Sequence, residues 1–173
     1  MGGCALLSAG AAQGQAASEA VGKVGNWDVT VADKTRCMIN RLYGNDVTAP
    51  PQGGLAIMYD PREKSLAFVW ASIKPTYLPA EGDQDFGIAF VTGKSANVSW
   101  GHPSFNYKKR LTTYYFTHVF SGEAEVQRFL HDVASNDGVV FFSGAAPVVG
   151  FNLDAAGAVE KLRECASKID GTP

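Results

Sequence analysis

Apolar side chains alternate with other residues in many short segments of this chain, and this alternation constrains the fold more than any other feature. The alternating segments, separated by turn residues, are 27–31, 36–43, 55–59, 66–70, 86–91, 97–100 and 111–120. A period of two residues is typical of β-strands. In 86–91 both faces are apolar, so this strand is expected at the centre of a sheet.

The period changes after Ser121-Gly122, where apolar residues recur at helical spacing. This spacing predicts an amphipathic helix over 123–135, with Ser121 or Gly122 as its cap. Two short strands are expected over 139–142 and 148–153. Asp154 is then expected to cap a last helix.

These elements predict a fold of the α+β class within one β-rich domain over 25–170. Its architecture would be an antiparallel β-sheet or barrel-like sandwich with one internal amphipathic helix and a C-terminal helix. The 173-residue chain is 46% hydrophobic and 18% charged, as expected of a folded domain, and its 19 glycines suit many turns. Its formal net charge of −2 gives no global indication of a nucleic-acid partner.

The first eighteen residues carry no charged side chain. Their apolar run, 5–12, is shorter than the roughly 20 residues of a membrane-spanning helix and lacks a stripe of large side chains. Together with Gly14-Gln15-Ala16 it matches the latter part of a secretory signal, although no Lys or Arg precedes it. Three interpretations remain open: a start upstream of Met1, an atypical signal, or a disordered tail. We expect 1–20 to be a signal-peptide-like or disordered segment of a periplasmic or secreted protein. No lipid anchor is expected at Cys4.

Removal of that segment would leave two cysteines, Cys37 and Cys165. An even number in an exported protein predicts a disulfide, here between an early strand and the last helix. The alternative is a pair of reduced, buried thiols that behave as small hydrophobic groups.

Both ends of the chain carry motifs of a known group. Gly25-Asn26-Trp27-Asp28-Val29 with Cys37-Met38-Ile39, and Gly150-Phe151-Asn152-Leu153-Asp154 before Cys165, resemble small exported proteobacterial proteins similar to the invasion-associated locus B group. The family's additional early cysteine is absent, and the middle of the chain does not share the likeness. The resemblance implies an envelope location and no established reaction.

Residues with catalytic or metal-binding chemistry do not form a recognisable motif. The three histidines lack zinc spacing; His118 is expected to be a satisfied core or half-buried residue on a strand, and His131 is expected to be solvated. No nucleophile-elbow sequence surrounds Ser104 or Ser143. We therefore predict no catalytic residue, no metal and no cofactor.

The carboxylates at 81, 83 and 85 form an acidic cluster in a Pro/Gly loop. The expected role is a solvated loop, and a weak Ca²⁺ site is the alternative.

The strongest candidate for a binding surface is the segment 100–115, which gathers aromatic and basic residues in a net-acidic protein. The predicted contact residues are Trp100, His102, Tyr107, Lys108, Lys109 and Arg110. Aromatic faces beside cations suit a glycan, an anionic lipid headgroup or the acidic surface of an envelope protein. Nucleic acid is not expected as a partner of an exported protein. The alternative is a hairpin with core aromatics and a solvated basic tip.

The sequence thus favours an exported, periplasmic envelope protein that acts by binding and is not an enzyme. The alternative is a small periplasmic hydrolase whose site is assembled from separate loops. A buried polar cleft that holds His102 or His118 beside an acid would favour the hydrolase.

Overall fold

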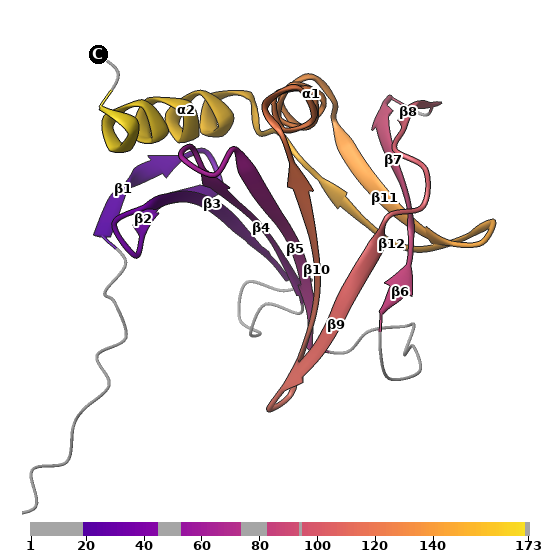
Figure 1. The fold of residues 1–173 in the computed structure, drawn as a ribbon. Coiled ribbons are helices and arrows are strands. Elements are labelled where there is room, and N and C mark those ends of the chain that lie inside the picture. Colours follow the sequence, from indigo (N-terminus) through magenta and orange to yellow (C-terminus); the bar gives the residue numbers. More distant parts are fainter. Residues whose placement is uncertain (1–18, 45–52, 74–82, 94, 172–173) are drawn as a thin grey trace, which may run out of the picture.

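The computed structural model describes residues 19–44, 53–73, 83–93 and 95–171, which form two sheets and two helices (Figure 1). The larger sheet has eight strands in the order β1-β2-β3-β4-β5-β10-β9-β6, and the smaller has four in the order β12-β11-β7-β8. The elements are β1 (Glu19–Val24), β2 (Trp27–Ala32), β3 (Arg36–Tyr43), β4 (Gly53–Asp60), β5 (Ser65–Ser72), β6 (Gln84–Asp85), β7 (Gly87–Thr92), β8 (Ser95–Ser99), β9 (Ser104–Arg110), β10 (Thr113–Ser121), α1 (Glu123–Ser135), β11 (Gly138–Ser143), β12 (Ala146–Asn152) and α2 (Ala156–Asp170). This antiparallel, sandwich-like arrangement confirms the predicted α+β class.

The alternation along the strands gives the larger sheet one face toward the core. Ile39, Ile57 and Phe68 lie opposite one another on β3, β4 and β5, and all three are fully buried. The ring of Phe68 also packs 4.9 Å from that of Phe129 on α1 and 5.6 Å from that of Phe141 on β11. One core therefore joins the larger sheet, the internal helix and the smaller sheet.

Helix α2 closes the fold over the first strands of the larger sheet, on the same side as α1 (Figure 1). Its buried stripe includes Leu162 and Cys165, as the helical spacing predicted. Cys165 is bonded to Cys37 on β3, which confirms the predicted disulfide. The buried Trp27 indole donates a hydrogen bond to the Leu153 carbonyl, 2.9 Å away, so β2 holds the segment that leads into α2.

Three strands lie where none was predicted, and the shortest of them is the two-residue β6, which falls in the expected Pro/Gly loop. β1 begins inside the expected leader segment. Its side chains are mostly exposed, so its sequence lacks the alternation of apolar residues that indicates a strand. β9 occupies most of the segment between 101 and 110, for which the sequence pattern predicted neither a helix nor a strand. The expected strand 111–120 begins at Thr113 instead, because Leu111 and Thr112 form the turn between β9 and β10.

The helix caps agree with expectation at one helix and not at the other. α1 is capped by Gly122, whose φ of 93° suits glycine, and no side chain caps it. The predicted Asp154 cap of α2 is wrong: the helix begins at Ala156 after Ala155, without a side-chain cap. Asp154 has a φ of 44° and lies before the cap position.

Candidate binding surface on the β9–β10 hairpin

A tight hairpin presents a leucine at its tip. Arg110 pairs with Thr113, so only Leu111 and Thr112 connect the two strands. Leu111 has a φ of 54° and is 95% exposed. In Figure 1 this end of the hairpin points away from the two helices. A large apolar side chain thus stands in water on a backbone that disfavours it.

Three exposed cations precede that leucine on β9. Lys108, Lys109 and Arg110 lie opposite Tyr115, Tyr114 and Thr113 in the ladder. Directly paired residues share a face, so Lys108 and Arg110 project from the outer face of the sheet and Lys109 from the core-side face. The Lys109 ammonium lies 5.1 Å from the centre of the Tyr114 ring. Within the described residues, no carboxylate forms an ion pair with any of the three cations.

The tyrosine of the predicted surface supports the hairpin from its core side. Tyr107 is half-buried, with its ring 6.1 Å from that of Tyr114 and 5.2 Å from that of Phe116. Its aromatic face therefore packs against neighbouring rings. Tyr107 and Lys109 thus lie on the core-side face of the hairpin, and Lys108 and Arg110 lie on its outer face.

Trp100 has a different role, at the junction with α1. Its indole donates a hydrogen bond to Asp132 Oδ2, 2.9 Å away, and its ring packs 5.3 Å from that of Phe129. The Arg128 guanidinium lies 4.3 Å from the Trp100 ring centre. Asp132 is 7% exposed and acidic, so the indole N–H offsets part of the cost of burying it. Trp100 and the hairpin tip lie beyond opposite ends of the seven-residue β9, which spans about 20 Å.

The histidines do not form an acid–base pair in the described parts of the chain. His102 is exposed, and its ring fits closely over Gly87, where an added Cβ would lie 3.1 Å from its Cε1. His118 is half-buried, as predicted, with its Nδ1 2.8 Å from the Ser104 carbonyl oxygen. Neither ring contacts a carboxylate among the described residues. His131 is exposed, which confirms that prediction.

Part of the acidic cluster lies outside the described residues, namely Glu81. Asp83 and Asp85 are both exposed, and Asp83 Oδ1 accepts a hydrogen bond of 2.8 Å from the Asn106 amide. In the described ranges, no group of three or more His, Cys, Asp or Glu side chains could hold a metal ion.

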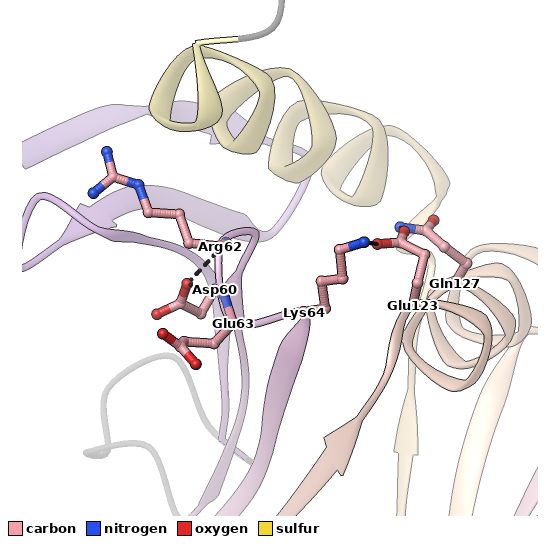
Figure 2. A network of polar contacts seen from close by, with 6 residues as sticks. All are labelled: Asp60, Arg62, Glu63, Lys64, Glu123 and Gln127. Atoms are coloured by element: carbon pink, nitrogen blue, oxygen red, sulfur yellow. Dashed lines mark hydrogen bonds and ion pairs between the residues drawn. The ribbon is translucent and has the colours of Figure 1, made fainter.

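A polar cleft of about 310 Å³ lies between the β4–β5 turn and the two helices. Figure 2 shows the polar contacts beside this cleft. Lys64 Nζ lies 3.9 Å from Glu123 Oε2, and Glu123 Oε1 accepts a hydrogen bond of 2.9 Å from Gln127 Nε2. Asp60 caps the turn by accepting hydrogen bonds from the backbone N–H groups of Arg62 and Glu63 (Figure 2). Among these contacts, the ion pair between Lys64 and Glu123 joins the turn to α1.

Tyr59 lines the same cleft, next to the disulfide, since it pairs with Cys37. Burial, assisted by the carboxylates of Glu123 and Asp170, raises the pKa of Tyr59 above its ordinary value. The phenol is therefore a weaker acid than usual. The β4–β5 turn meets the two helices at this cleft, which the sequence analysis did not predict.

An apolar groove of about 420 Å³ lies on the outer face of the larger sheet and was also missed. We call it the outer-face groove; it runs across β3, β4, β5 and β10. Its lining includes Met38, Leu42, Gly54, Ala56, Val69, Ala71 and Tyr115. The signal was present in the sequence, because positions 56, 67, 69 and 71 place apolar residues on the second face of two strands.

No family model, curated protein or solved structure matches this chain. Among the residues that the structure describes, no helix has the length and apolar character needed to cross a membrane. The protein has an antiparallel α+β sandwich-like fold with an internal disulfide. Its β9–β10 hairpin carries three cations and has a leucine at the tip.

Proposed function

We propose that this protein is exported to the bacterial envelope and acts there by binding, without catalysis, through the β9–β10 hairpin. The surface it contacts carries anionic lipid headgroups. The observation that carries the proposal is Leu111, 95% exposed at the tip directly after three cations.

The leucine and the cations of this tip suit the two regions of a membrane surface, the acyl-chain boundary and the anionic headgroups. An exposed leucine gains free energy by entering the boundary between headgroups and acyl chains. Each Lys or Arg near an anionic surface contributes about 1 kcal/mol, so the three cations together contribute about 3 kcal/mol. Such binding is reversible and weakens with salt.

The other expected partners are less well served by the geometry. A glycan needs an open aromatic face, whereas the Tyr107 ring packs against the rings of Tyr114 and Phe116, and the Lys109 ammonium lies over the Tyr114 ring. An acidic patch on an envelope protein could use the cations but gives no role to Leu111. The hydrolase alternative lacks an assembled nucleophile–base pair among the described residues. The Cys37–Cys165 disulfide supports export, because disulfides persist in oxidising compartments.

Sedimentation with phosphatidylcholine vesicles, with and without phosphatidylglycerol, tests the proposal. We expect binding only to the anionic vesicles, and a loss of roughly 100-fold when Lys108, Lys109 and Arg110 are changed together to Ala. The matched control changes Lys23, Lys34 and Lys168 to Ala, which removes the same charge elsewhere and should leave binding within about twofold. Equal losses in both triple variants, or equal binding to neutral vesicles, would refute the proposal.

A further inference from the structure

We propose that the outer-face groove holds one acyl chain of an anionic phospholipid whose headgroup is bound by Lys108 and Arg110. This inference rests on the proposed function, in which the cations contact lipid headgroups, and adds a site for the acyl chain. It assigns a site to the lipid as a single molecule, in addition to the contact between the hairpin and a membrane surface.

The shape of the groove suits a hydrocarbon chain. Its volume of about 420 Å³ falls within the range of roughly 300–1,000 Å³ that small-molecule sites occupy. It crosses four neighbouring strands, a distance of about 14 Å at the usual strand spacing. Small residues form its floor, since Gly54, Ala56 and Ala71 face outward at its centre, and Met38, Leu42 and Val69 are among the larger side chains around them.

The sheet beneath the groove excludes a peptide strand as the occupant. β4, β5 and β10 are each paired on both sides, so no unpaired strand edge borders the groove at its centre. A peptide laid across this face would bury N–H and C=O groups without partners, which is costly. A hydrocarbon chain has no polar groups that need hydrogen-bond partners.

The strand register places two cations at one end of the groove and on the same face. Tyr115 lines the groove and pairs with Lys108, and Thr113 lines it and pairs with Arg110. Because directly paired residues share a face, both cations stand beside the lining, one strand further along the sheet. Lys109 projects from the opposite face, over Tyr114. The apolar lining and the two adjacent cations together define an amphiphile with an anionic head.

Isothermal titration calorimetry with monomeric lysolipids tests this assignment. The probes are dodecanoyl lysophosphatidylglycerol and dodecanoyl lysophosphatidylcholine, kept below the concentrations at which they form micelles. We expect one lysophosphatidylglycerol per protein, bound roughly tenfold or more tightly than its zwitterionic counterpart. Shortening the chain to decanoyl should weaken binding about fifteenfold, or roughly fourfold for each methylene lost.

Two pairs of variants separate the groove from its surroundings. Ala71→Leu fills the groove and should weaken binding at least tenfold, whereas Ala67→Leu, on the same strand and face but outside the lining, should not. If Ala71→Leu does not fold by circular dichroism, Ala56→Leu provides the same test from β4. Changing Lys108 and Arg110 to Ala should remove the headgroup preference, and Lys109→Ala should retain it.

The outcomes distinguish this inference from the function on which it rests. Undiminished lysolipid binding by folded Ala71→Leu and Ala56→Leu refutes the groove assignment, even if the triple cation variant still loses vesicle binding. Tighter binding of dodecanoate than of lysophosphatidylglycerol also refutes it, because the ligand would then be a free fatty acid. If the triple variant keeps full vesicle binding, the proposed function fails.

Discussion

Cys37 and Cys165 are joined across a sequence separation of 128 residues, with 6.0 Å between their Cα atoms. The bond links β3, near one edge of the larger sheet, to α2, the helix that covers its first strands. Both side chains are buried in the core. All the described elements from β4 to β12, α1 included, lie inside the loop that this bond closes, so it constrains the unfolded chain strongly.

Changing both cysteines to Ala should lower the free energy of unfolding by about 2–5 kcal/mol, because the unfolded chain regains the entropy of an open loop. Chemical denaturation of the wild-type and double-variant proteins, both purified under oxidising conditions, measures the difference. Peptide mapping without reductant should find the peptides of Cys37 and Cys165 linked. Free thiols at both positions would contradict the assignment.

Tyr43 should make the stability of the fold depend on alkaline pH. Burial raises the pKa of its phenol from 10.0 to about 12, although the nearby Arg41 lowers it in part. Its hydroxyl donates a hydrogen bond of 2.6 Å to the Asn152 carbonyl. Below pH 10 both the folded and unfolded states keep the proton, and the stabilisation is complete. Between pH 10 and about 12 the unfolded state loses the proton first, so stability falls as the pH rises.

Tyr43→Phe should therefore lose less stability than the wild type over that pH range, while being about 1 kcal/mol less stable at neutral pH through the lost hydrogen bond. Denaturation curves at pH 7, 9, 10.5 and 11.5 provide the comparison. Identical slopes above pH 10 in the two proteins would assign the alkaline loss to other groups.

The alternation of side chains was sufficient to predict the core strands and the two helices, because burial of one face imposes a visible period. It failed at β1, whose side chains are mostly exposed. It also failed at β9, whose last three residues are charged and interrupt the pattern. The predicted cap at Asp154 failed because the chain turns there before the helix begins, a tertiary constraint that local propensity does not contain.

The geometry of the candidate binding surface could be predicted only in part. Trp100 and Arg110 are close in sequence, but Trp100 precedes the extended β9 and Arg110 ends it, so about the length of the strand separates them. The register that places Lys108 beside Tyr115, on the face of the groove, depends on where the hairpin turns. The turn at Leu111 lacks the usual Gly or Asn signal, so the sequence did not locate it.

Leu111 provides a last prediction that separates stability from binding. Its φ of 54° disfavours any side chain, and its exposure of 95% gives the leucine almost no packing in return. Leu111→Gly should raise the free energy of unfolding by up to about 1 kcal/mol, since glycine accepts this backbone conformation. The same change removes the apolar group from the tip, so binding to phosphatidylglycerol vesicles should weaken by roughly 5- to 30-fold, as expected for roughly 1–2 kcal/mol of lost apolar burial.

Val119→Ala is the matched control, because Val119 is 53% exposed on the same β10 strand but away from the tip. It should leave vesicle binding unchanged. Thermal unfolding and vesicle sedimentation on the three proteins measure the two effects independently. A Leu111→Gly protein that is more stable yet binds less well would mean that the tip keeps a strained leucine for contact with the membrane. A variant that is more stable and binds equally well would remove Leu111 from the binding surface and leave the cations alone to account for it.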